Sequence, residues 1–164
     1  MTSLPPQEFV ARMRAPFGVL EIVSDGRALT RVAYLPRDAQ AKAAPDRVTA
    51  LAVREVENYL LDATFKFTVP LAPRGTDFQS RVWKALSAIP AGQSRTYGEV
   101  ARLIRSAPRA VGQACGSNPL ALIVPCHRVV GAQGHLGGFM HAQAGDPLFI
   151  KRWLLAHEGY RFGG

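Results

Sequence analysis

Apolar and polar positions in the first half of the chain alternate with the period of β-strands and then change to the period of a helix. Residues 17–23 and 29–35 each predict a strand, and the Asp-Gly pair at 25–26 is typical of a hairpin turn. Apolar residues between 51 and 60 recur at helical spacing, and residues 66–71 predict a further short strand. We therefore expect a small sheet with one helix.

A linker separates this region from a second one. Pro70, Pro73 and Gly75 interrupt regular structure, so we place a boundary near residue 74, between an N-terminal domain (1–74) and a C-terminal domain (75–164). Thr76 or Asp77 can cap a helix whose apolar residues recur at helical spacing up to residue 89. The C-terminal domain is therefore expected to begin with a helix.

Two further helices are predicted close together in the second half. Thr96 and Glu99 have the spacing of a capping box that opens a helix over residues 97–104. Ser106 is expected to cap the next helix, which has Pro108 in its first turn and ends near residue 115. Two short helices joined by a tight turn are typical of a helix-turn-helix, although many such pairs bind no nucleic acid.

An apolar run of strand length, residues 120–124, leads directly into Pro125 and Cys126. A glycine-rich loop follows over residues 131–138, and a last helix is predicted over residues 148–157. Cys126 is therefore expected at the end of a buried strand.

Charge is distributed unevenly between the two halves. The chain has 20 Lys and Arg residues against 12 Asp and Glu, a net charge of +8. Residues 1–75 carry ten basic and eight acidic residues, and residues 76–164 carry ten and four, which gives +2 and +6. The positive helical half predicts a polyanionic partner such as nucleic acid. On charge alone, a basic protein without such a partner remains an alternative.

Cysteine count and hydropathy exclude several classes of protein. Cys115 and Cys126 are the only cysteines, too few for a disulfide framework or a thiolate zinc site, so we expect no metal and no other cofactor. The longest apolar run, residues 120–124, is too short to cross a membrane, and the first residues lack the apolar core of a secretory signal. We expect a cytoplasmic protein without membrane association.

Cys126 is the candidate nucleophile. A thiol reacts as the thiolate, which a nearby base or positive charge favours, and His127 and Arg128 follow it directly. Local context leaves open whether Cys126 is reactive or fills space, whereas Cys115, in a predicted helix, fits a structural role. Neighbours on a flat strand point to opposite faces, so contact between Cys126 and His127 requires Pro125 to break the strand or a water to link them.

The motif PCHRVV at residues 125–130 resembles the active-site motif of the O6-alkylguanine-DNA alkyltransferases, also called methylated-DNA–protein-cysteine methyltransferases. Four further runs agree with this family in order and approximate spacing, so the resemblance covers most of the chain. It implies an α+β fold, with a ribonuclease H-like N-terminal sheet domain and a C-terminal winged helix-turn-helix-like domain. The four runs are RGTDFQSRVWKAL at 74–86, YGEVA at 97–101, RAVGQACGSNP at 109–119 and KRWLLAHEG at 151–159.

The same resemblance implies a reaction. Cys126 would accept an alkyl group, normally methyl, from O6-alkylguanine in double-stranded DNA, in one turnover that inactivates the protein; O4-alkylthymine is a further candidate substrate. His127 would activate the thiol through a water, and Glu158 would orient His127. Arg128 would belong to the buried polar support of the site, and Asn118 would brace the turn before it. The protein is expected to act as a monomer.

The resemblance also implies how DNA is handled. Tyr97 would help rotate the damaged nucleotide out and contact its base, and Arg109 would replace that base in the stack. The interval between these two residues is about two residues shorter than is usual in the family, so we expect a tighter turn. Phe139 stands where a tyrosine is usual, in a loop over 136–148 with extra residues. A phenyl ring stacks but donates no hydrogen bond, so rate and substrate range are expected to differ.

Three other functions fit parts of the pattern. A protein that binds alkyl lesions without transfer would lack the acceptor cysteine, which is present here. A helix-turn-helix transcription factor would read the major groove, usually as a dimer. A thiol hydrolase would turn over esters or amides. Labelling of Cys126 by alkylated DNA separates all three from an alkyltransferase.

Overall fold

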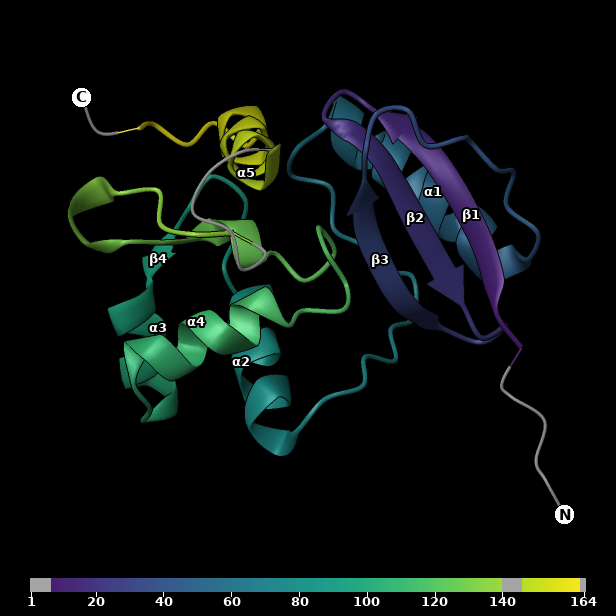
Figure 1. Ribbon diagram of the computed structural model, residues 1–164. Helices are drawn as coiled ribbons and strands as arrows, with labels where there is room; N and C mark the ends of the chain where they lie inside the picture. Colours follow the sequence, from purple (N-terminus) through teal and green to yellow (C-terminus); the bar gives the residue numbers. More distant parts are fainter. Residues whose placement is uncertain (1–6, 140–145, 163–164) are drawn as a thin grey trace, which may run out of the picture. The chain divides into compact units, whose positions relative to one another are not determined.

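The computed structural model describes residues 7–139 and 146–162, which form two compact units, residues 1–74 and 75–164 (Figure 1). Strands dominate the first unit and helices the second, so the mixed α+β architecture predicted from the sequence is confirmed. Within the described ranges, no helix is long and apolar enough to cross a membrane.

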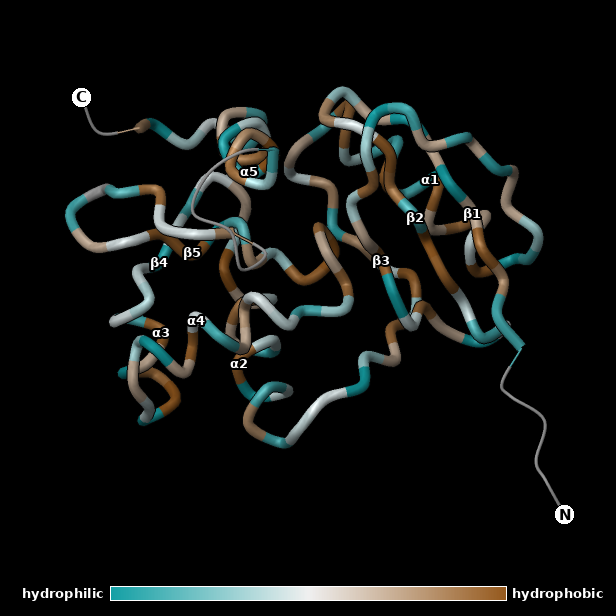
Figure 2. Tube along the Cα trace, viewed as in Figure 1, coloured by the Kyte–Doolittle hydropathy of each residue, from teal (hydrophilic) through white to brown (hydrophobic). Residues whose placement is uncertain are grey.

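The N-terminal unit is an antiparallel sheet packed against one helix. Strands β1 (Phe9–Ala15), β2 (Gly18–Ser24) and β3 (Leu29–Leu35) pair in the order β1-β2-β3, and α1 (Arg47–Leu61) contacts β1 and β2. The Asp25 carboxylate closes the predicted hairpin turn by accepting two backbone hydrogen bonds. Brown, apolar residues follow the strands and α1 in Figure 2, as expected for a sheet with one covered face.

The short strand predicted over residues 66–71 is wrong. Only Leu71 pairs with the sheet there, through an isolated bridge to Leu29. The backbone N–H groups of Thr68 and Val69 instead donate to the carboxylate of Glu55, both at 2.9 Å. A buried carboxylate therefore satisfies the donors that a neighbouring strand would otherwise bond.

The C-terminal unit places a small parallel strand pair among four helices of the described chain. The capping box predicted at Thr96 is present, and Thr76, one of the two predicted caps of the first helix, also forms a capping box, with Gln79. The elements are α2 (Asp77–Ser87), β4 (Arg95–Thr96), α3 (Tyr97–Ile104), α4 (Pro108–Gly116), β5 (Val129–Val130) and α5 (Asp146–His157), with β4 parallel to β5.

The predicted cap of α4 is wrong. Its N-cap is Ala107, without a side-chain hydrogen bond, whereas Ser106 completes the end of α3 by donating its N–H to the Ala101 carbonyl at 2.8 Å. Arg105 has the left-handed conformation, with φ of 57°, that this type of helix ending requires. Three residues therefore connect α3 to α4, and the tight turn that was expected is present.

The buried strand predicted over residues 120–124 is also wrong. The segment forms tight turns, with Leu122 at φ of 71° and the Val124 N–H donating to the Leu120 carbonyl at 2.9 Å. It leads into a single 3₁₀ turn, Cys126–Arg128. The apolar composition of this segment predicted its burial. Its backbone, however, is fixed by hydrogen bonds to polar groups beside it and not by strand partners. Cys126 and His127 consequently do not lie on a flat strand.

Candidate functional site

Cys126 begins the 3₁₀ turn and is only 3% exposed. Burial raises the pKa of its thiol, because a thiolate is poorly solvated in the protein interior. A hydrogen bond with Asn118 and the positive charge of Lys151 act in the opposite direction and favour the thiolate. The thiol is therefore protonated at rest and sits among groups that stabilise its reactive form.

Asn118 fixes the turns that carry Cys126. Its side-chain amide donates to the Val124 carbonyl at 2.9 Å, and its amide oxygen accepts the Leu120 N–H at 2.9 Å. The side chain is buried, so both bonds form away from water. Asn118 thus joins the start and the end of the segment that precedes Cys126.

His127, Glu158 and Arg128 form a largely buried polar cluster. The Glu158 carboxylate lies 2.8 Å from His127 Nε2 and accepts from Arg128 Nε at 2.8 Å and Nη2 at 2.9 Å. Arg128 also donates to the Ile89 carbonyl at 2.6 Å. Burial alone would raise the pKa of Glu158, but these hydrogen bonds outweigh it and hold the pKa well below its usual range.

The protonation of His127 follows from this contact. Burial lowers the pKa of His127 despite the adjacent carboxylate, so the imidazole is neutral at pH 7. An ionised carboxylate only accepts hydrogen bonds, which assigns the ring proton to Nε2. Nδ1 therefore keeps its lone pair, and among the described residues it has no hydrogen-bond partner. His127 is arranged as a base.

Lys151 is a site residue that the sequence reasoning missed. It lies on α5, is fully buried, and donates from Nζ to the Gly138 carbonyl at 2.8 Å. Its ammonium lies 5.8 Å from the ring centroid of Tyr97 and 6.0 Å from that of Phe139. Burial lowers its pKa to about 8. The signal was present in the sequence, because Lys151 shares a helix face with buried Leu154 and Leu155 at helical spacing.

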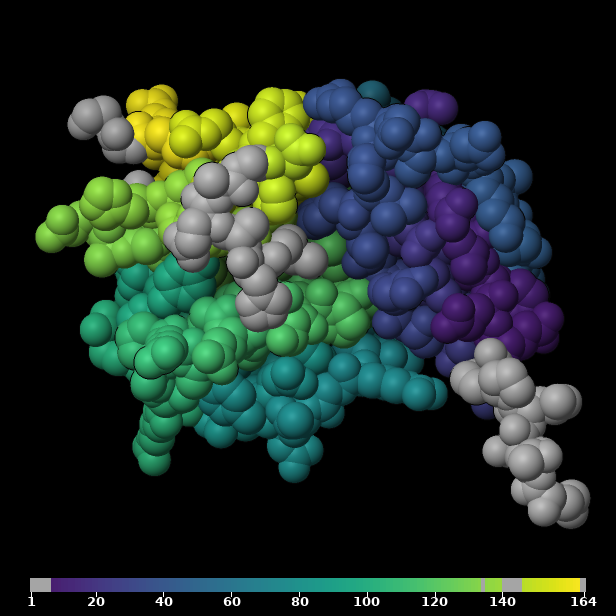
Figure 3. Space-filling model, viewed as in Figure 1, coloured from purple at the N-terminus to yellow at the C-terminus, as the bar shows by residue number. Residues whose placement is uncertain are grey.

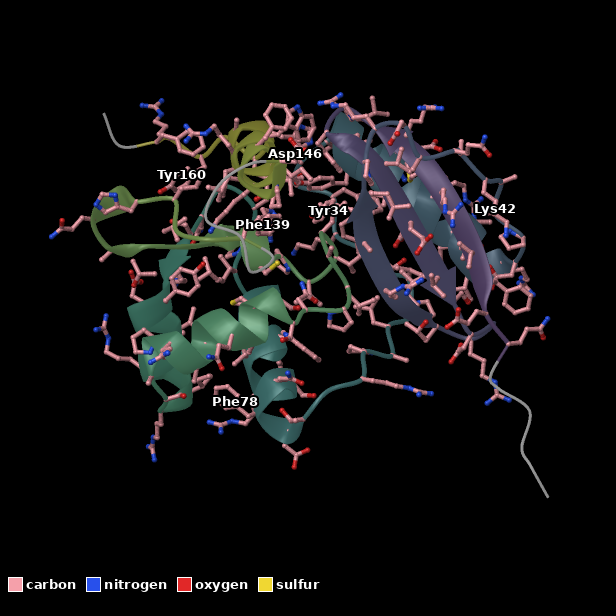
Figure 4. The ribbon with its side chains drawn as sticks, viewed as in Figure 1. Tyr34, Lys42, Phe78, Phe139, Asp146 and Tyr160 are labelled. Atoms are coloured by element: carbon pink, nitrogen blue, oxygen red, sulfur yellow. The ribbon has the colours of Figure 1, made fainter. Side chains whose placement is uncertain are left out.

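The aromatic rings of Tyr97 and Phe139 both lie near this ammonium. Tyr97 opens α3 and donates its hydroxyl to the Gly138 carbonyl at 3.2 Å. Phe139, labelled in Figure 4, is 4% exposed. Gly137 has φ of +74°, and a Cβ there would lie 3.0 Å from the Tyr97 ring, so glycine is required. Six residues after Phe139, 140–145, belong to the atypical loop 136–148 and lie outside the described residues.

Arg109, by contrast, is exposed at the second position of α4. Arg102 and Arg105 are exposed on the preceding helix and turn. In the space-filling view, long side chains project from the teal and green surface formed by α2, α3 and α4 (Figure 3). The predicted site residues thus separate into a buried group around Cys126 and an exposed, basic helix pair. In the described part of the chain, no three His, Cys, Asp or Glu side chains are placed to hold a metal ion.

Comparisons of the sequence with known proteins all point to one family. The family described as 6-O-methylguanine DNA methyltransferase, DNA binding domain, matches residues 77–160. A methylated-DNA–protein-cysteine methyltransferase of Methanosarcina mazei is 43% identical over 154 residues, 89% of this chain and 94% of that protein. This chain belongs to the methylated-DNA–protein-cysteine methyltransferase family. A member from Mycobacterium tuberculosis is 44% identical over 153 residues, 90% of each chain.

Solved structures of the methylated-DNA–protein-cysteine methyltransferase family share the fold. The O6-methylguanine methyltransferase of Mycobacterium tuberculosis superposes with a TM-score of 0.80 and 39% identity, over 93% of both chains. A Mycobacterium tuberculosis OGT crystallised in complex with DNA superposes with a TM-score of 0.76 and 42% identity, over 91% of both chains.

Proposed function

We propose that this chain repairs DNA by moving an alkyl group, normally methyl, from the O6 atom of guanine onto Cys126 in a single irreversible transfer. The observation that carries the proposal is a buried cysteine whose neighbours are a neutral histidine with a free nitrogen, a carboxylate that holds that histidine, and a buried ammonium. Alkylated duplex DNA is the partner, with O4-alkylthymine as a second substrate, and the protein acts as a monomer.

His127 and Glu158 provide the base. The thiol proton of Cys126 passes to Nδ1 of His127 through a bridging water, and Glu158 stabilises the imidazolium that forms. Lys151 compensates the thiolate charge, because a buried ammonium favours an adjacent anion. A thiol with a raised pKa can still react, because His127 accepts its proton and Lys151 offsets the negative charge that forms on sulfur.

The transfer itself is a substitution at the alkyl carbon. Sγ of Cys126 forms a bond to that carbon as the bond between carbon and O6 breaks, and the electron pair returns to the guanine, which takes up a proton. The product is a thioether, which no described group is placed to cleave. The protein is therefore consumed by one reaction.

Access requires the damaged nucleotide to leave the duplex, because O6 is enclosed in the base stack and Cys126 is buried. We assign Tyr97 to rotating the nucleotide and contacting its base, and Phe139 to stacking on the base. Arg109, exposed near the start of α4, fills the space that the base leaves. Basic residues of α3 and α4 supply attraction to phosphates.

Stoichiometry tests the proposal. The protein is incubated with excess duplex that carries one O6-methylguanine, and the lesions removed per protein are counted. We expect saturation at one lesion per protein, none with Cys126→Ala, and wild-type behaviour with Cys115→Ala, which removes the other buried thiol. Continued turnover, or transfer by Cys126→Ala, would contradict the proposal; binding to the lesion without removal would indicate a lesion-binding protein instead.

A further inference from the structure

Two side chains of α2 bond backbone carbonyls of the α3–α4 pair. The guanidinium of Arg81 donates to the carbonyl of Ile104, the last residue of α3. The indole of Trp83 donates to the carbonyl of Ala114 in α4 at 2.9 Å. Trp83 is buried, whereas Arg81 is exposed at the edge of the packing. One helix is therefore attached to both members of the pair through separate hydrogen bonds.

The connection that Arg81 reaches is otherwise held by backbone hydrogen bonds from Arg105 and Ser106 to the last turn of α3. It spans three residues, and Arg105 holds a left-handed conformation that a residue with a Cβ adopts at a cost. The next helix starts without a side-chain cap. The last carbonyls of a helix have no partner within the helix, and a cation near that end is favourable. The bond from Arg81 satisfies one of these carbonyls at the point where the chain turns.

We infer that Arg81 is a positioning residue for DNA engagement: it holds the α3–α4 turn and thereby fixes Arg109, which lies five residues after Ile104, without touching DNA itself. The inference rests on the proposed function, because it assumes that Arg109 enters the duplex. Arg81 acts through the carbonyl of Ile104, so its guanidinium is already engaged in the free protein.

An alternative role for Arg81 is a direct phosphate contact, since the residue is exposed in the basic half of the chain. Salt dependence distinguishes the two roles. Affinity falls as salt is added, and each phosphate contact that is lost makes the plot of log affinity against log salt shallower by about 0.9. A residue that only positions the turn leaves this slope unchanged, because it releases no counterion from the DNA.

The experiment compares Arg81→Met with Lys84→Met, which removes an exposed cation one turn along the same helix. Transfer is measured from a duplex carrying O6-methylguanine and from free O6-benzylguanine base, and affinity for undamaged duplex is measured across salt concentrations. We expect Arg81→Met to slow transfer from duplex about five- to tenfold, in line with loss of one charge-assisted hydrogen bond. Its rate with the free base and its salt slope should match wild type.

Two further measurements complete the test. Arg81→Gln keeps a donor without the charge and should recover part of the duplex rate. Amide hydrogen exchange over residues 104–108 should quicken in Arg81→Met and not in Lys84→Met. A salt slope reduced by about one, with no recovery in Arg81→Gln, would overturn the inference in favour of a phosphate contact. Equal losses on duplex and free base would also overturn it.

Failure of the proposed function would look different. Wild type would then modify Cys126 with neither substrate. The positioning role would still be decided by duplex affinity, its salt slope and amide exchange at the turn, because these readouts need no alkyl transfer. Unchanged exchange and unchanged affinity in Arg81→Met would overturn the inference under those conditions.

Discussion

The side chains around Cys126 and those on the α3–α4 surface are held in opposite ways. Around Cys126, the polar side chains of Asn118, His127 and Glu158 are buried, and each is held by side-chain hydrogen bonds. On the helix pair, Arg109 is exposed and depends on backbone geometry for its position. The first region is built for chemistry that tolerates no displacement, and the second for contact with a large charged partner.

This contrast separates two kinds of effect. Substitutions in the buried cluster should change stability and the chemical step together, because each partner removed leaves another buried group unsatisfied. Substitutions on the helix pair should change only how duplex DNA is handled.

The largest effect is expected for Glu158→Gln, which leaves the partly buried Arg128 without its ionic partner. The free energy of unfolding in urea should fall by about 3 kcal/mol. The pKa of Glu158 is depressed in the folded protein, so its contribution is present above the ordinary value of 4.5 and declines as pH falls below it. As the pH is lowered from about 5 to about 3, the free energy of unfolding of Glu158→Gln should therefore fall less than that of wild type. An exposed control, Glu57→Gln, should change neither quantity.

Replacing His127 by asparagine should slow transfer from duplex and from free base alike, by about a hundredfold, because the base is removed from both reactions. Burial holds the pKa of His127 below 6.5, so wild-type rate should fall only as the pH drops below that value and the imidazole becomes protonated. The variant should lack this acidic limb. A pH profile that stays the same in His127→Asn would remove His127 from the mechanism.

Arg109→Ala tests the exposed region. Transfer from duplex should slow about tenfold, since the cost of keeping the nucleotide out of the stack is no longer offset. Transfer from free O6-benzylguanine should be unchanged, as should thermal stability. Arg54→Ala, an exposed arginine on α1, is the matched control. Equal losses on both substrates would contradict the assignment of Arg109 to the duplex.

Phe139→Tyr should have the smallest effect. The ring is buried beside the Lys151 ammonium, so the added hydroxyl should cost about 1 kcal/mol of stability while the aromatic surface that stacks on the base is kept. Single-turnover rates with methyl and benzyl substrates should both change less than about threefold. A large gain in rate would show that this position needs a hydroxyl to bind the base.

Much of the fold was readable from local signals. Residues 97–104 were predicted as a helix with the bounds that α3 has, because a capping box marks its start and the apolar period marks its length. The strand β1 was missed, although Ala11 and Met13 alternate with Arg12 and Arg14 in the pattern of a half-buried strand. Its pairing with β2 depends on a turn without a strong sequence signature.

The two wrong strand predictions have a common cause. Residues 66–71 and 120–124 were predicted as strands, and the structure instead satisfies their backbone through Glu55 and Asn118, respectively. These bonds come from polar side chains and not from a neighbouring strand, so the period of the apolar residues does not report them. The contact between His127 and Glu158 likewise depends on how α5 packs, and so does the burial of Lys151. The family resemblance suggested the contact and helical spacing can suggest the burial, whereas composition suggests neither.

The most direct test is to react the protein with duplex DNA that carries one trideuteromethyl group on O6 of guanine, and to locate the label by peptide mass spectrometry. Transfer to Cys126 predicts one trideuteromethyl group per protein, on the peptide that contains Cys126, and none on the peptide that contains Cys115. A label elsewhere, or an unlabelled protein that still binds the lesion, would contradict it.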